Sequence, residues 1–137
     1  MLNAEESHWL IVHYCTVRSL VEEKLHKAER SLLHRGLATV RSTRSFVPTD
    51  PRQLYITPSS AGRAYVQEHM LLRLLNFLFD TQRFTEIEYL FAKLPMGRLP
   101  ELLVCENPDL RFRAEERVQA LKNGTNRSTT KLSHYIP

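Results

Sequence analysis

Arginine is concentrated in one stretch of this 137-residue chain, and its side-chain chemistry suits contact with phosphate groups. The guanidinium group forms paired hydrogen bonds with phosphate oxygens or with the edge of guanine. The stretch from residue 30 to residue 66 therefore predicts a nucleic-acid contact, although a basic surface that only aids solubility fits it equally. Its single acidic residue is Asp50, and its arginines are Arg30, Arg35, Arg41, Arg44, Arg52 and Arg63.

A second basic group lies near the C-terminus, where acidic residues accompany it. Its members are Arg111, Arg113, Arg117, Lys122, Arg127 and Lys131. Because Glu115 and Glu116 lie among them, we interpret this group as a solvated surface. The net charge of +4 and the pI near 9.3 permit a nucleic-acid partner without requiring one.

The remaining reactive residue types do not form a convincing catalytic or metal-binding pattern. The four glycines are dispersed, and His26 and His34 lack the second pair of ligands that a zinc site needs. Cys15 and Cys105 lie among apolar residues and are interpreted as small core residues, although a Cys–His pair stays an alternative. We expect no cofactor, no metal and no enzymatic activity.

Composition indicates an ordinary globular protein of one domain, residues 1–124, followed by a mobile polar tail, residues 125–137. No apolar run approaches the roughly 18 residues of a membrane span, so we expect no membrane partner. The N-terminus carries acids where a secretory signal has basic residues, and two cysteines give no disulfide framework. These features predict a cytoplasmic protein.

The elements that must position the arginines begin with an apolar stripe at helical spacing. Asn3 and Glu6 form a candidate capping box, and Gly36 suits the end of a helix. The pattern predicts one helix of about 30 residues, or a break near Cys15 and Thr16 followed by a second helix. The face predicted to form a dimer contact contains Leu10, Tyr14, Val17, Val21 and Leu25.

A β-hairpin is predicted over about residues 37–57, with a basic tip that contains two prolines. Ser59 or Ser60 then serves as the N-cap of a helix that continues through the apolar run to Phe79. This arrangement places Arg41, Arg44 and Arg52 on the hairpin.

The stretch "LFAKLPMGRLPELLVCENPDLRF", residues 90–112, predicts two short helices joined by a tight turn. Pro95 ends the first helix, Gly97 permits the reversal, and Pro100 is tolerated in the first turn of the second. This is the helix-turn-helix layout, with Arg98 in the turn. Glu101 in the second helix counts against strong contact with a DNA groove.

Two segments resemble winged-helix repressors of the MarR or PadR types. The segments are "RGL" at residues 35–37 and Thr57-Pro58 with Gly62-Arg63, although Ser59 and Ser60 are inserted into the second phrase. The resemblance implies a recognition helix that ends at "RGL", a β-hairpin wing, and then a dimerisation helix. It implies that arginines on the wing reach a minor groove or backbone phosphates. Too few residues precede Val17 for the usual first helices of that family.

A second, shorter resemblance covers about thirty residues. "LPMGRLPELL" is similar to the helix-turn-helix of the FlhC type of flagellar regulator, and the run from Pro95 to "LRF" is similar to its partner FlhD. The resemblance implies a helical transcription activator assembled from several chains. The zinc-binding cysteine cluster of FlhC has no counterpart here, since the chain has two cysteines.

Together these observations predict a mainly α fold with one small β-hairpin, winged-helix-like or helix-turn-helix. The predicted function is a DNA-binding transcriptional regulator that pairs with a second copy or a related subunit. Its predicted contacts with double-stranded DNA are Arg35, Arg41, Arg44, Arg52, Arg63 and Arg98. The alternative is a non-catalytic adaptor or inhibitor that docks onto a protein through its long first helix. An RNA-binding variant ranks last, because Phe46 and Tyr55 are the aromatic residues near the arginines.

Overall fold

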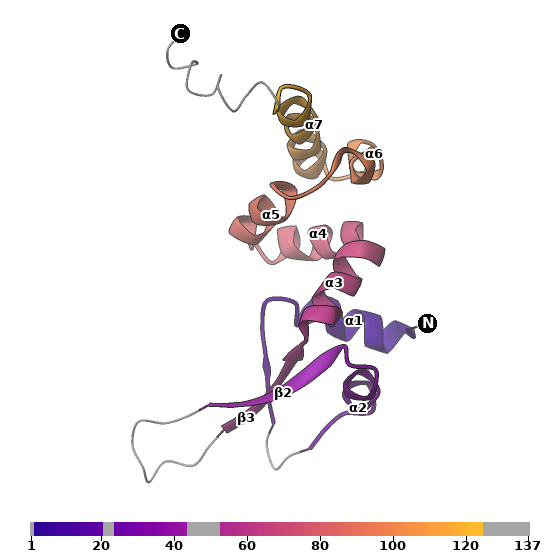
Figure 1. Ribbon diagram of the computed structural model, residues 1–137, viewed down its shortest axis with the longest axis vertical. Coiled ribbons are helices and arrows are strands. Elements are labelled where there is room, and N and C mark those ends of the chain that lie inside the picture. The colour runs from indigo at the N-terminus through magenta and orange to yellow at the C-terminus, as the bar shows by residue number, and fades with distance from the viewer. Residues whose placement is uncertain (1, 21–23, 44–52, 125–137) are drawn as a thin grey trace. The chain divides into compact units, whose positions relative to one another are not determined.

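The computed structural model of the protein describes residues 2–20, 24–43 and 53–124 (Figure 1). This part of the chain is mainly helical with one small antiparallel sheet, which confirms the predicted fold class and is compatible with a small winged-helix-like domain. Contacts divide the chain into two compact units, residues 1–74 and 75–137, and we describe each by itself. The predicted tail, residues 125–137, lies outside the described residues.

The first unit contains three strands and the helices around them; β2 and β3 are labelled in Figure 1. Its elements are α1 (Ala4–Val12), β1 (Arg18–Leu20), α2 (Lys27–His34), β2 (Ala38–Thr43), β3 (Gln53–Pro58) and α3 (Ser60–His69). The strands lie in the order β1-β3-β2, so β3 pairs on both sides, with Arg18 opposite Ile56 and Val40 opposite Ile56. The predicted hairpin is confirmed as β2 and β3, and β1 adds a third strand.

The prediction of one long N-terminal helix is wrong, and so is the alternative of a second helix from Val17. The Asn3–Glu6 capping box is present, but α1 ends at Val12, and the chain then turns into β1. The turn is held because the Thr57 hydroxyl donates to the Thr16 carbonyl at 3.2 Å and β1 pairs with β3. Distant residues of β3 therefore override the local helical spacing.

A single helix from Ser60 through Phe79 is also a wrong prediction. Ser59 caps α3 as expected, by accepting a hydrogen bond from the Gly62 amide at 3.1 Å. The chain leaves helical geometry at Met70 (φ −137°, ψ 34°), and α4 (Leu71–Asp80) follows. Buried positions follow a spacing of four up to Met70 and restart at Leu71, so the break allows both apolar sets to be buried.

The core of the first unit joins all of its described layers. Apolar side chains from α1, α2, the sheet and α3 are excluded from solvent there; the fully buried ones include Leu10, Leu32, Ile56 and Val66. Two of the buried residues are acidic, Glu6 and Glu29. These two carboxylates need partners inside the fold, because an unpaired buried charge is strongly destabilising.

The second unit is helical throughout its described part. Its elements are the end of α4, then α5 (Phe84–Phe91), a 3₁₀ turn (Met96–Arg98), α6 (Pro100–Leu103) and α7 (Pro108–Lys122). The predicted turn is confirmed, with Pro100 in the first turn of α6 and Leu99 and Leu102 fully buried. Among the described residues, no helix is both long and apolar enough to cross a bilayer.

Candidate nucleic-acid interface

The helix α2 ends at a glycine whose backbone no other residue type adopts easily. Gly36 has φ +77°, its amide donates to the Leu33 carbonyl at 3.1 Å, and the Leu37 amide donates to the Leu32 carbonyl at 2.8 Å. This pair of bonds is the Schellman arrangement, which satisfies the last carbonyls of a helix. It directs the chain out of α2 and straight into β2.

The two segments that carry the winged-helix resemblance meet in the fold. The Ser59 hydroxyl donates to the Gly36 carbonyl at 2.7 Å, and the Ser59 amide donates to the Leu37 carbonyl at 3.0 Å. Gly62 lies so close that a Cβ there would be 2.1 Å from the Leu37 oxygen. The start of α3 is therefore fastened to the turn between α2 and β2, and the helix and the hairpin are held in one arrangement.

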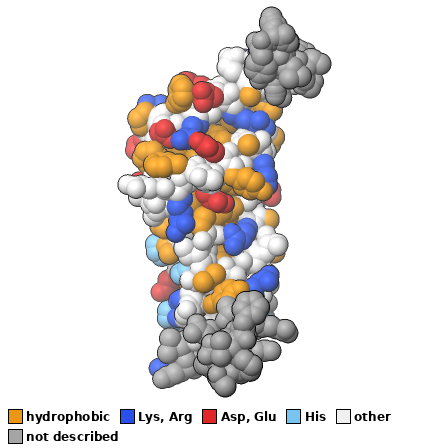
Figure 2. All heavy atoms as spheres, turned by 90° about the vertical axis from the view of Figure 1, so that its left-hand side faces the viewer, with side chains coloured by type: hydrophobic (Ala, Val, Ile, Leu, Met, Phe, Trp, Pro, Cys, Tyr) orange, Lys and Arg blue, Asp and Glu red, His pale blue; other side chains and the backbone are white. Residues whose placement is uncertain are grey.

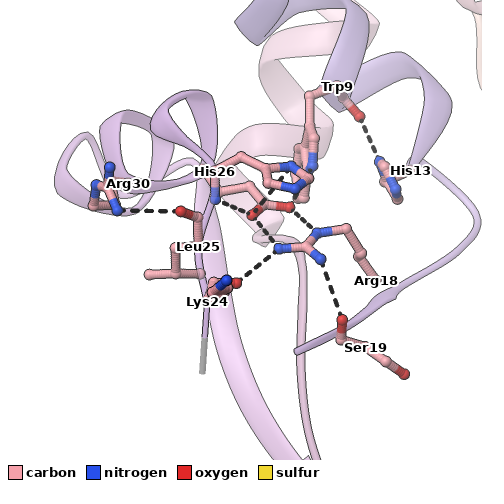
Figure 3. Close-up of polar contacts among 9 residues, drawn as sticks. Trp9, His13, Arg18, Ser19, Lys24, Leu25, His26 and Arg30 are labelled. Atoms are coloured by element: carbon pink, nitrogen blue, oxygen red, sulfur yellow. Dashed lines mark hydrogen bonds and ion pairs between the residues drawn. The ribbon is translucent and has the colours of Figure 1, made fainter. Parts of the chain in front are cut away.

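Glu29 is the acidic residue of α2, and its side chain is fully buried. Figure 3 shows Arg18, Trp9 and His26 converging on one point, where their donors meet this carboxylate. Arg18 donates to both carboxylate oxygens, one of them at 2.6 Å, the Trp9 indole donates at 2.9 Å, and the His26 amide donates at 2.8 Å. The buried charge is thus fully partnered.

Burial by itself would raise the pKa of Glu29, since a carboxylate loses hydration. The hydrogen bonds from Arg18, the His26 amide and Trp9 outweigh that effect and lower the pKa to about 2. The same pairing raises the pKa of Arg18. Arg18 also donates to the carbonyls of Ser19 and Lys24 (Figure 3), so its guanidinium is committed to the interior contact.

With Glu29 turned inward, the outward side of α2 carries basic residues. Lys27, Arg30 and His34 recur at spacings of three and four, which places them on one side of a helix, and all three are exposed. We call these three residues the α2 basic face. Arg30 donates to the Leu25 carbonyl at 3.1 Å (Figure 3), which orders its side chain near the start of the helix.

Of the predicted DNA contacts on the hairpin, Arg41 is described and exposed, whereas Arg44 and Arg52 lie outside the described residues. Arg41 pairs with Tyr55 in the register of β2 and β3. Because neighbouring strand positions face opposite ways, Arg41 projects from the side of the sheet opposite to buried Ile56. The hairpin follows α2 directly, and α2 packs beside β2.

The other predicted contacts are engaged elsewhere. Arg35 follows α2 and lies 3.8 Å from buried Glu6, with its side chain 42% exposed. Arg63 is half-buried, donates to the Tyr14 carbonyl and stacks over the Tyr14 ring at 5.3 Å. Arg98 belongs to the second unit, where it lies 3.9 Å from Glu101. Arg35, Arg63 and Arg98 thus contact other residues of the chain, whereas Arg41 is exposed on the hairpin.

The residues predicted to form a dimer face do not share one helix. Leu10 and Tyr14 are buried within the first unit, Val17 is exposed, Leu25 is half-buried, and Val21 lies outside the described residues. The described members of the stripe are divided among α1, the segment between α1 and β1, and the approach to α2. The prediction of a continuous dimerisation stripe is wrong because the helix that would carry it is absent.

Charged side chains of the second unit are intermingled. Figure 2 shows acidic, basic and apolar side chains interspersed over its helices on the face in view. Arg113 donates to Asp109 at 2.7 Å and reaches Glu88 at 3.5 Å, which raises the pKa of Arg113. The helix α6 spans one turn and carries exposed Glu101. The helix-turn-helix segment thus offers a less basic surface than α2.

Lys27 was not identified from the sequence as a candidate contact. Arg30 was grouped with the arginines of residues 30–66 but was not placed on one side of a helix. The signal was present, because Lys27, Arg30 and His34 have helical spacing, but the apolar spacing through Leu25 and Leu32 was used to define the expected long helix instead.

Among the described residues, no three His, Cys, Asp or Glu side chains are placed to hold a metal ion. No protein-family model, curated protein or solved structure matches this chain.

Proposed function

We propose that this protein is a DNA-binding transcriptional regulator of winged-helix type, acting in the cytoplasm, with α2 and the β2–β3 hairpin as its contact with double-stranded DNA. The observation that carries the proposal is the α2 basic face, which exists because the acidic residue of that helix is buried and paired with Arg18. A short helix with exposed basic residues, followed at once by a hairpin with exposed Arg41, suits phosphate contact from two elements.

The charge of the first unit supports the same proposal. Residues 1–74 contain ten Lys and Arg residues and seven Asp and Glu residues, and two of the acids, Glu6 and Glu29, are buried. Arginine and lysine that neutralise phosphates release condensed counterions, so such binding weakens steeply with salt. The proposed partner is duplex DNA, and the proposed assembly is a dimer or a pair with a related subunit.

The test is fluorescence anisotropy with a random-sequence DNA duplex at two salt concentrations. We expect micromolar binding at low salt that falls steeply as salt is added. The combined variant Lys27→Ala, Arg30→Ala and Arg41→Ala should lower the slope of log K against log[salt] by about three units, near 0.9 for each lost phosphate contact.

The matched control removes three exposed basic residues from the second unit: Arg83, Lys93 and Lys122, each changed to Ala. It loses the same charge and should keep the wild-type salt slope. Circular dichroism checks that both variants are folded. Unchanged DNA affinity in the first variant, or equal losses in the two variants, contradicts the proposal.

A protein-interaction role is the second candidate, and exposed apolar side chains of the second unit favour it. Tyr89 is 56% exposed, Phe112 57% and Val104 81%, and exposed apolar side chains mark a contact surface where they form one contiguous patch. Docking through a long first helix, the earlier alternative, is not supported, because α1 ends at Val12. Absence of DNA binding at low salt, together with self-association that Val104→Ser and Phe112→Ser abolish, would favour this candidate.

A further inference from the structure

A pocket of about 420 Å³ lies within the first unit, between α1 and the first turn of α2. Its apolar lining comes from Trp9 and Val12 of α1 and Ala28 of α2, and polar groups come from His8, His26 and Lys27. Small-molecule sites are commonly concave and apolar, with a few polar groups that fix orientation. This pocket has that composition, and the α2 basic face shares Lys27 with it.

The α2 side of the pocket is electropositive. Lys27 and Ala28 are the first two residues of α2, where helix amides lack intrahelical acceptors and the helix dipole favours negative charge. Lys27 adds an amine, and His8 and His26 add ring nitrogens that can donate hydrogen bonds. The nearby carboxylate of Glu29 does not cancel this potential, because Arg18 neutralises it.

The remaining lining limits the charge that the pocket accepts. Glu5 contributes one carboxylate, which disfavours a ligand with several negative charges. Burial lowers the pKa of His13, an effect that its hydrogen bond with the Trp9 carbonyl only partly offsets. Burial thus disfavours the charged form of His13, and its ring stacks on Trp9 with centroids 4.6 Å apart. Beside the electropositive side, the lining is thus aromatic and aliphatic.

We propose that this pocket binds a small organic monocarboxylate, with the carboxylate at Lys27 and the start of α2 and the apolar body against Trp9 and Val12. The site shares Lys27 with the proposed DNA contact but does not include Arg30, His34 or Arg41, and it does not require that DNA contact to exist. A bound ligand would contact α2 directly, because the first turn of that helix forms one wall of the pocket.

Trp9 makes the proposal directly measurable, because it is the chain's single tryptophan and lines the pocket. Tryptophan emission of the full chain is followed during titration with sodium hexanoate, with hexanamide as the uncharged match and inorganic phosphate as the anion without an apolar body. We expect a saturable change with hexanoate and at most a weak change with the other two. No saturable change with hexanoate, or an equal change with hexanamide or phosphate, overturns the proposal.

Lys27→Gln should weaken hexanoate binding about five- to tenfold, as expected for loss of a charge-assisted hydrogen bond. Lys24→Gln removes the same charge from an exposed neighbour outside the pocket lining and should bind as the wild type does. Equal affinities in the two variants overturn the proposed placement of the carboxylate. These titrations contain no DNA, so they stand or fall independently of the proposed function.

Discussion

In the first unit the carboxylates of Glu6 and Glu29 are buried, whereas in the second unit Glu88 and Glu101 lie at the surface within 4 Å of arginines. Burying an acid leaves the outer side of its helix to the basic residues. Placing an acid beside an arginine on the surface cancels the charge where a partner would meet it. The same residue types thus give α2 a basic exterior and give the helices of the second unit a mixed one.

The comparison predicts that removing one carboxylate has very different costs in the two units. Glu29→Ala should lower the free energy of unfolding by about 3 to 5 kcal/mol, because it leaves Arg18 and the Trp9 indole without their partner in a buried site. Urea denaturation monitored by Trp9 fluorescence measures this. A loss below about 1 kcal/mol would show that the buried carboxylate does not hold the unit together.

Glycine positions give a second contrast between the units. Gly62→Ala should cost about 2 kcal/mol, because the new Cβ would be 2.1 Å from the Leu37 backbone oxygen and the two segments would have to separate. Gly97→Ala has no atom within 4 Å of the new Cβ and should leave stability within about 0.5 kcal/mol of the wild type. Thermal melting of both variants tests the pair, and equal melting temperatures would contradict it.

Acid should weaken the first unit through Glu29. The pKa of Glu29 in the folded protein is about 2, below its ordinary value of 4.5. Its stabilising contribution is therefore complete above about pH 4.5 and is lost as the pH falls toward 2. The expected loss from this residue is about 2 kcal/mol at pH 3, measured as the difference between the wild type and Glu29→Gln in urea unfolding at pH 6 and pH 3. The same difference at both pH values would contradict it.

The smallest expected effect is at the surface of the second unit. Glu88 lies 3.5 Å from Arg113, with its side chain 69% exposed, and exposed pairs of this kind contribute little in water. Glu88→Ala should change the free energy of unfolding by less than about 0.5 kcal/mol. A loss comparable to that of Glu29→Ala would remove the distinction between the two units.

Residues that begin or end helices predicted several parts of the fold correctly. Asn3 caps α1, Gly36 ends α2, Ser59 caps α3, and Pro100 begins α6. These residues act on neighbours a few positions away, through φ preferences or a single side-chain hydrogen bond. Local chemistry of that kind is readable from sequence, and the two strands of the hairpin were predicted for the same reason.

The failures came from contacts between distant residues. The apolar spacing from Leu10 to Leu32 is helical. The segment after α1 nevertheless forms β1, because Thr57 hydrogen-bonds to Thr16 and Ile56 pairs with Arg18. Likewise, nothing in the sequence next to Glu29 shows that Arg18 and Trp9 will surround it. The basic side of α2 could therefore be identified only after the helix was bounded and its acid was seen to be buried.

The central position of β3 has a consequence for the order in which this unit can assemble. As the chain leaves the ribosome, α1, β1 and α2 are complete before the strand that must lie between β1 and β2 has been made. The pairing of Leu20 with Leu54 joins residues far apart in the sequence and therefore closes a long loop. Contacts of that kind slow folding. Until β3 arrives, neither β1 nor β2 has its strand partner, and unpaired strands can pair with other chains. One six-residue segment thus decides when the sheet can form, and β1 and β2 remain its two edges.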